Sequence, residues 1–376
     1  MAIDFLRGIA VLAVVNDHWQ DSFKELKDVK SLSFIQSFFD YCGWVGVDLF
    51  FVLSGFLVSG LLFKEYRKTG AMSPGRFLVR RGFKIYPGFY CLLFFIAGLT
   101  LLRDPHAFHW PRFLAEGLFV QNYFEGIFGH TWSLAVEEHF YLSLAFVLFL
   151  LSKTTILNRR SLFLRLGFGT ILLVFSMRLV NALLSPTASI SGTDFTLGSQ
   201  YHVTHLRLDG LLFGVMLSYL YHFENARLLR FCQRWRIPMI LLGLLIVLLV
   251  APWLNIQTIS LYPSNGFWLG TIGFTLLYFA WGGVLMGAIA LPARVWNNAV
   301  GRIVAWVGFY SYSIYLWHLF IAATVIKGVA ALRLTNYPHL MMLVYSILAV
   351  LGGYLAAKAV EMPMLALRDR LFPRKT

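Results

Sequence analysis

Chemistry-bearing residues stand at both ends of the apolar stretch "LRGIAVLAVVNDH", which runs from residue 6 to residue 18. In a helix, Arg7 and His18 would lie about 16 Å apart along the axis. A guanidinium binds phosphate groups well, and an imidazole takes up a proton near neutral pH. The stretch therefore predicts an anion-binding group and a general base at opposite ends of one helix.

Ionisable residues also interrupt other apolar stretches, where a charged side chain is costly unless it faces a cavity or a partner. The ones that could act in chemistry are Asp48, Glu137, Glu138, His139, Arg178, His205, Arg207, Asp209 and His318. A second basic group consists of Arg7, Arg76, Arg80, Arg81 and Lys84. No compact set of histidines and carboxylates has the spacing of metal ligands, so no metal is expected.

Composition indicates which elements must position these residues. Of 376 residues, 58% are hydrophobic and 13% are charged, and the apolar residues come in long blocks. This pattern is typical of a polytopic membrane protein in a lipid bilayer. The net charge of +14 fits basic loops that face anionic lipid. It does not indicate nucleic-acid binding, since no basic soluble domain is visible. The three cysteines show no disulfide framework or metal spacing.

We predict an all-α membrane protein with about ten transmembrane helices in a single domain over residues 1–376. The predicted spans are 3–20, 42–63, 85–102, 130–152, 166–184, 205–222, 237–254, 267–290, 303–326 and 339–360. With both termini cytoplasmic, the inner segments and Arg7 hold 22 Lys and Arg residues, and the outer segments hold 7. This asymmetry satisfies the positive-inside rule.

In this layout the polar residues fall at two depths. The carboxylates, the imidazoles and Arg178, Arg207 fall in the outer half of the membrane, and the basic group falls at the inner face, where Pro87 is expected to set the bend into the third span. Two depths suit a reaction that joins a cytoplasmic anionic donor to an extracytoplasmic acceptor. Glu137 and Glu138 lie about 100° apart on a helix, so only one can face the site fully. We favour Glu137, because Tyr141 shares its face.

Each of these residues also has a structural interpretation. Arg7 could anchor the first helix at the inner face, and Arg80 and Arg81 could be topology signals. His18 could be an interfacial histidine, Asp48 a helix cap, and Arg207 with Asp209 a salt pair. His318 shares a helical face with Ser311 and Tyr315 and could line a cavity or pack in the core. Ser54 and Gly55 could suggest an acyl-serine nucleophile, but small residues more often permit close helix packing, which we favour.

Several motifs occur together in the order typical of one family. They are Asp4 and Arg7 with His18, "GVDLFFVLSGFL" with Asp48, Ser54 and Gly55, Arg80 and Arg81 with Pro87, "WSLAVEEHFY" with Trp132, Ser133, Glu137, Phe140 and Tyr141, "RLDGLLFG", and "SYSIYLWH". On these residues the chain resembles the acyltransferase 3 family of integral membrane acyltransferases, which act mainly on carbohydrates. The resemblance covers nearly the whole chain. One departure is "VVNDHWQ", where Asn16 and Asp17 replace the usual apolar residues before the histidine.

The resemblance implies an acyl-CoA donor, usually acetyl-CoA, that enters from the cytoplasm. It implies His18 as the catalytic base, and Arg7 with the Arg80–Arg81 loop as donor contacts. Many relatives carry a C-terminal extracytoplasmic hydrolase-like domain, and the sequence is expected to be a stand-alone form without one. Transfer to the acceptor is then direct or needs a separate extracytoplasmic protein. The family also implies a bacterial plasma membrane.

The sequence therefore predicts a membrane O-acyltransferase that acetylates a hydroxyl of a saccharide or glycoconjugate. The catalytic candidates are His18, Glu137 and Asp48. The candidate donor contacts are Arg7, Arg80, Arg81 and Lys84. The candidate acceptor contacts are Trp132, Tyr141, Arg207, Asp209 and His318. The alternative functions are a proton-coupled transporter or flippase, since intramembrane His, Asp and Glu residues also form proton relays, and a non-catalytic scaffold.

Overall fold

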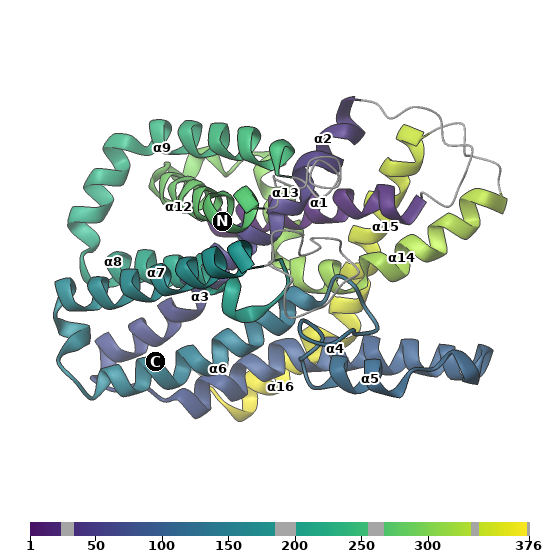
Figure 1. Cartoon of the computed structure of the whole chain (residues 1–376), viewed down its shortest axis with the longest axis horizontal. Helices are drawn as coiled ribbons and strands as arrows, with labels where there is room; N and C mark the ends of the chain where they lie inside the picture. Colours follow the sequence, from purple (N-terminus) through teal and green to yellow (C-terminus); the bar gives the residue numbers. More distant parts are fainter. Residues whose placement is uncertain (24–33, 185–200, 255–266, 332–337, 374–376) are drawn as a thin grey trace. The chain divides into compact units, whose positions relative to one another are not determined.

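The structure, a computed structural model, describes residues 1–23, 34–184, 201–254, 267–331 and 338–373. Every regular element in these ranges is helical (Figure 1). The longer helices are α1 (Ala2–Phe23), α2 (Phe34–Cys42), α3 (Gly46–Thr69), α4 (Pro74–Arg103), α5 (Trp110–Gly117), α6 (Trp132–Ser152), α7 (Arg160–Leu184), α8 (Leu208–Phe223), α9 (Asn225–Trp253), α12 (Phe274–Ala290), α13 (Ala299–Phe309), α14 (Ser311–Ala331), α15 (Pro338–Ala356) and α16 (Met362–Leu371). The short elements are η1 (Gly43–Val45), η2 (Pro105–Ala107), η3 (Ile156–Asn158), η4 (Thr204–Leu206), η5 (Leu269–Gly273), η6 (Ala293–Val295) and η8 (Ala357–Glu361).

Seven helical segments within the described ranges are long and apolar enough to cross a bilayer. They are Ser37–Thr69, Pro74–Arg103, Trp132–Ser152, Arg160–Leu184, Asn225–Trp253, Leu269–Ala290 and His339–Leu371. The prediction of an all-α polytopic membrane protein is thereby confirmed. The other three predicted spans fall on α1, on α8 and on α13 with α14. The number of ten spans, the cytoplasmic termini and the single domain stay predictions. Of the segments predicted to be outer, 255–266 and most of 185–204 lie outside the described residues.

Two predicted boundaries are wrong. The ninth span, 303–326, is two helices, because the backbone leaves the helix at Tyr310 between α13 and α14. The basic segment expected as a loop before the third span is helical, since α4 begins at Pro74 and continues through Pro87 to Arg103. Proline at the first helical position fits its fixed φ and missing N–H. Arg80 and Arg81 are therefore neighbours on a helix and point about 100° apart.

The chain divides into two compact units, and the first comprises Met1–Phe50, Phe83–Leu92 and Leu291–Thr376. Within it α1 packs against α13, α14 and α15. The crossing of α1 and α13 is close: a Cβ at Gly8 would lie 2.1 Å from the Val304 carbonyl oxygen, and a Cβ at Gly308 would lie 1.7 Å from the Asp4 carbonyl oxygen. Glycines permit this backbone approach between membrane helices. The end of α1 that carries Arg7 thus lies in close backbone contact with α13.

The second unit comprises Phe51–Gly82 and Leu93–Ala290. Figure 1 shows α9 and α12 side by side, and α8 packs against α7 and α12. Glycines again mark a close crossing, since a Cβ at Gly55 of α3 would lie 1.9 Å from the Leu211 carbonyl oxygen of α8. A Cβ at Gly214 would lie 2.3 Å from the Val52 carbonyl oxygen. The predicted packing role of Gly55 is confirmed.

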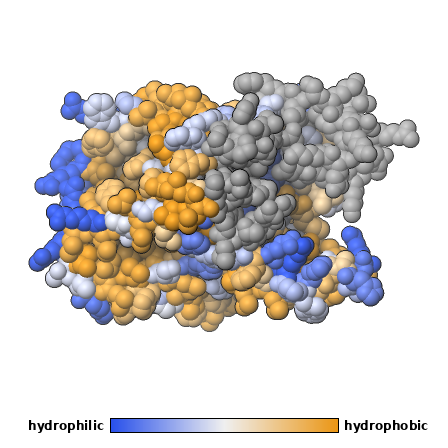
Figure 2. All heavy atoms as spheres, viewed as in Figure 1, coloured by the Kyte–Doolittle hydropathy of each residue, from blue (hydrophilic) through white to orange (hydrophobic). Residues whose placement is uncertain are grey.

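Large apolar side chains are exposed along the spanning helices. Figure 2 shows them over much of the visible face. On α9 they include Leu241, Leu242, Leu245, Leu248 and Leu249. Exposed apolar area on helices of spanning length is what contact with lipid requires. Polar side chains that lie among these apolar residues are described next.

Candidate active site

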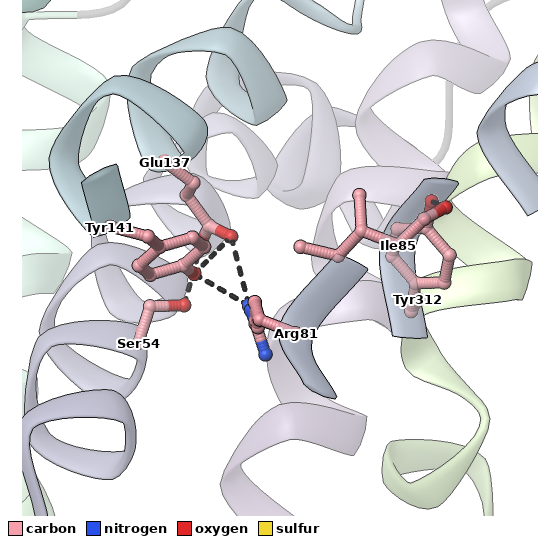
Figure 3. Close-up of polar contacts among 6 residues, drawn as sticks. All are labelled: Ser54, Arg81, Ile85, Glu137, Tyr141 and Tyr312. Atoms are coloured by element: carbon pink, nitrogen blue, oxygen red, sulfur yellow. Dashed lines mark hydrogen bonds and ion pairs between the residues drawn. The ribbon is translucent and has the colours of Figure 1, made fainter. Parts of the chain in front are cut away.

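Four polar side chains from α3, α4 and α6 meet in the second unit, and we call them the Glu137 network: Ser54, Arg81, Glu137 and Tyr141 (Figure 3). The Ser54 hydroxyl donates to Glu137 Oε1 at 2.7 Å. The Tyr141 hydroxyl donates to Glu137 Oε2 at 2.6 Å and accepts from an Arg81 guanidinium nitrogen at 2.7 Å. Glu137 and Tyr141 are four residues apart on α6, so they share one face.

Charge reinforces this network. A guanidinium nitrogen of Arg81 lies 3.8 Å from Glu137 Oε2, and the Arg81 guanidinium carbon lies 4.3 Å from the centre of the Tyr141 ring. Cation–π contact and hydrogen bonding together hold the planar guanidinium in one orientation. Two hydroxyls and one cation thus restrain a single carboxylate.

The network unites residues that the sequence assigned to different roles. Arg81 is a predicted donor contact, Glu137 a predicted catalytic residue and Tyr141 a predicted acceptor contact. The predicted shared face of Glu137 and Tyr141 is confirmed. For Ser54 the structure adds a polar contact to the packing role that we favoured, because its hydroxyl donates to Glu137. No local pattern could indicate this bond, since Ser54 and Glu137 are 83 positions apart.

Two imidazoles meet in the first unit, and we call His18 of α1 and His318 of α14 the histidine pair. His318 Nε2 lies 3.4 Å from His18 Nδ1, and the ring centres are 5.1 Å apart in an edge-to-face arrangement. His318 is fully buried, and His18 is half-buried. The sequence placed both histidines near the outer side but did not pair them.

The remaining candidates of the first unit have other partners. A guanidinium nitrogen of Arg7 lies 3.6 Å from an Asp4 oxygen on the same helix. The Lys84 ammonium forms an ion pair with buried Glu361, which also accepts from the Ser313 hydroxyl at 2.6 Å. Glu361 of η8 was not a predicted site residue.

One residue beyond Lys84, the Ile85 carbonyl accepts a hydrogen bond of 2.6 Å from the Tyr312 hydroxyl (Figure 3). Asp48 is buried in the first turn of α3.

The alternative interpretation of Arg207 and Asp209 as a salt pair is wrong. Asp209 pairs instead with Arg178 of α7 at 2.6 Å, and both side chains are almost fully buried. Arg178 also donates to the Leu206 carbonyl at 3.1 Å. Residues two apart cannot face each other on a helix, whereas a residue of a packed neighbouring helix can.

Arg207 lies in an aromatic cage instead. Its guanidinium carbon is 3.6 Å from the centre of the Phe274 ring and 5.3–5.7 Å from those of Tyr201, Phe51 and Trp132. Arg207 and Trp132 are 2% and 5% exposed. Trp132, the first residue of α6, therefore presents no open ring face to a sugar in this conformation.

A carboxylate that the sequence analysis missed anchors the loop before α6. Glu116 of α5 is fully buried and accepts from the backbone N–H groups of Ile127 at 3.0 Å and Phe128 at 3.3 Å, and from the Thr131 hydroxyl. Burial raises the pKa of Glu116 to about 7, which the three hydrogen bonds oppose. A carboxylate inside the apolar run "FLAEGLF" was the available signal.

Glu116→Gln is expected to flatten the pH dependence of thermal stability. An unfolded Glu titrates near pH 4.3, so the folded chain binds the proton more tightly. The stability that protonated Glu116 contributes is therefore complete below about pH 4 and is lost as pH rises through about 7. We expect the melting temperature of the wild type to fall from pH 5 to pH 8 more than that of Glu116→Gln. The exposed Glu125→Gln serves as the control, and parallel curves for all three proteins would refute the expectation.

In the ranges that the structure describes, no group of three or more His, Cys, Asp or Glu side chains lies close enough to hold a metal ion. The polar side chains described above include carboxylates, hydroxyls, imidazoles and arginines. His18 can accept a proton, and the arginines can bind a phosphate.

Comparison with known proteins assigns this arrangement to a family. The family model described as "Acyltransferase domain" matches residues 2–358. A candidate O-acetyltransferase of Staphylococcus aureus (strain COL) is 28% identical over 337 residues, which cover 84% of this chain and 49% of that protein. Peptidoglycan O-acetyltransferase OatA of Listeria monocytogenes is 27% identical over 338 residues, 84% of this chain and 48% of that protein.

A candidate peptidoglycan O-acetyltransferase of Bacillus subtilis, YrhL, is 25% identical over 338 residues, 84% of this chain and 47% of that protein. The chain spans about half the length of the curated relatives it matches. No solved structure matches it. Because the family match runs through both compact units and contains the Glu137 network and the histidine pair, the chain belongs to the acyltransferase domain family.

Proposed function

We propose that the protein is a membrane O-acyltransferase that moves an acetyl group from cytoplasmic acetyl-CoA to a hydroxyl of a saccharide or glycoconjugate. The family match over residues 2–358 carries this proposal. The names of two relatives specify peptidoglycan, so a glycan of the bacterial cell envelope is the acceptor class we favour. The seven apolar helices and the bacterial relatives support a place in the plasma membrane.

In the proposed reaction His18 accepts the proton of the acceptor hydroxyl, and the oxygen attacks the thioester carbonyl carbon. The carbon–sulfur bond breaks, and the CoA thiolate leaves and takes up the proton from His18. Either Glu137 or Asp48 steadies the histidine or positions the acceptor. The proposed acceptor contacts are Trp132, Tyr141, Arg207, Asp209 and His318, and all five side chains are buried.

The phosphates of CoA are assigned to Arg7, Arg80 and Arg81, with Lys84 nearby in the sequence. Arg81 already binds Tyr141 and lies near Glu137, so a phosphate would compete with these partners for its donors. Lys84 is engaged by Glu361, which makes it the weakest of the four donor contacts. Donor binding and the Glu137 network are thus expected to influence each other.

The test uses the purified protein in lipid nanodiscs with acetyl-CoA and a soluble peptidoglycan oligosaccharide. We expect release of free CoA thiol and an acetylated sugar, identified by mass spectrometry. A thioether analogue of acetyl-CoA, which cannot transfer its acyl group, is the control. Thiol release without sugar acetylation would assign the last step to a separate extracytoplasmic protein. The proposal fails if acetyl-CoA releases no more thiol than its thioether analogue does. If the saccharide substrate instead crosses liposome membranes together with protons, the transporter alternative replaces the proposal.

A further inference from the structure

The hydrogen bonds of the histidine pair fix the tautomer of each ring. His18 Nδ1 lies 2.9 Å from the Val14 carbonyl oxygen, one turn earlier on α1. His318 Nδ1 lies 2.5 Å from the Tyr315 carbonyl oxygen. A carbonyl oxygen only accepts, so each Nδ1 carries a hydrogen, and in the neutral ring Nε2 then carries the lone pair.

The lone pair of His318 is therefore directed at His18. His318 Nε2 lies 3.4 Å from His18 Nδ1, whose hydrogen also faces Val14. His318 is fully buried, and its ring centre is 5.7 Å from that of Tyr315, so packing keeps the ring in place. His18 Nδ1–H thus has two acceptors from two helices, α1 and α14.

We infer that His318 is a positioning residue for the base, an inference that rests on the proposed function. When His18 Nε2 takes the acceptor proton, the ring becomes a cation with its charge shared by both nitrogens. The Val14 carbonyl and His318 Nε2 then stabilise the Nδ1–H end and hold Nε2 toward the acceptor. A carboxylate has this role in the serine protease triad. A neutral imidazole supplies the acceptor without adding a second buried charge within the membrane.

The chain permits a matched pair of variants at His318. Asn at this position keeps a donor near the Tyr315 carbonyl but removes the acceptor that faces His18. Gln can place an amide oxygen where ring Nε2 lies and so retains that acceptor. A purely structural role would depend on the contact with Tyr315, and a positioning role depends on the contact with His18.

The experiment measures acetyl-CoA turnover by wild type, His318→Asn and His318→Gln in nanodiscs. For His318→Asn we expect kcat to fall about 10- to 100-fold, a part of what a whole general base contributes, with KM for acetyl-CoA within about twofold. His318→Gln should recover most of the loss. Equal activity of the two variants, or a change in KM alone, would overturn the inference.

A second measurement does not depend on turnover. Diethyl pyrocarbonate modifies the basic nitrogen of an imidazole, and peptide mass spectrometry reports the rate at His18. We expect this rate to fall several-fold in His318→Asn and to be close to wild type in His318→Gln. If the rate at His18 changes in this way in the two variants although the wild type transfers no acetyl group, the pairing of the histidines holds and the proposed function fails. If transfer occurs and the rate at His18 is the same in all three proteins, the proposed function holds and the inference fails.

Discussion

His18→Ala is expected to lower kcat for acetyl transfer by about 10²- to 10⁴-fold, the usual contribution of a general base. Binding of acetyl-CoA should change little, because the proposed donor contacts are arginines. The fold should also survive, since α1 is held by the close crossing at Gly8 and Gly308 and by the Ser346 hydroxyl, which donates to Asn16 Oδ1 at 2.8 Å. Free-thiol release and acetyl-CoA binding, both measured in nanodiscs, check the two expectations.

The control for this variant is His106→Ala, which removes an exposed histidine from η2. It should retain wild-type turnover. Loss of acetyl-CoA binding in His18→Ala would mean that the residue contacts the donor rather than the acceptor proton. Retained turnover would exclude His18 as the base, and Glu137 would then be the next candidate to test.

Relations along one helix were predictable from the sequence. Glu137 and Tyr141 are four residues apart, so the helical repeat alone places them on one face and separates Glu138 from them. The same reasoning explains why long apolar stretches located the helices.

Charge patterns were less informative about helix ends. Arg76, Arg80, Arg81 and Lys84 suggested a loop, although basic residues continue a helix well, and α4 begins at Pro74.

Relations between distant segments were not predictable in the same way. His18 and His318 are 300 positions apart, and the periodicity of α1 and α14 shows only which face each residue shares with its neighbours. The structural alternative for Asp209 paired it with the nearest charge in the sequence, Arg207. The structure pairs it with Arg178, since α7 packs against α8. A hydropathy average is likewise insensitive to one residue that leaves the helix, so the end of α13 at Tyr310 was missed.

Loss of one partner of the ion pair of Arg178 and Asp209 is expected to destabilise the second unit strongly. The two side chains are 0% and 3% exposed and 2.6 Å apart. Arg178 also lies 3.4 Å from the Thr275 hydroxyl of α12, so the pair joins α7, α8 and α12. Replacing one partner leaves the other charge buried without it, which costs about 3–5 kcal/mol. We expect both Arg178→Met and Asp209→Asn to lower the melting temperature in detergent strongly.

The double variant Arg178→Met with Asp209→Asn separates this explanation from simple loss of packing. Once both charges are gone, no unpaired ion remains in the apolar interior, and a buried pair often adds little net stability over neutral groups. The double variant should therefore melt above either single variant, which is a coupling that additive effects cannot give. Melting at or below the less stable single variant would show that the two residues stabilise independently. In that case Asp209 would be available for the acceptor role that the sequence suggested, and activity per folded molecule in Asp209→Asn would measure it.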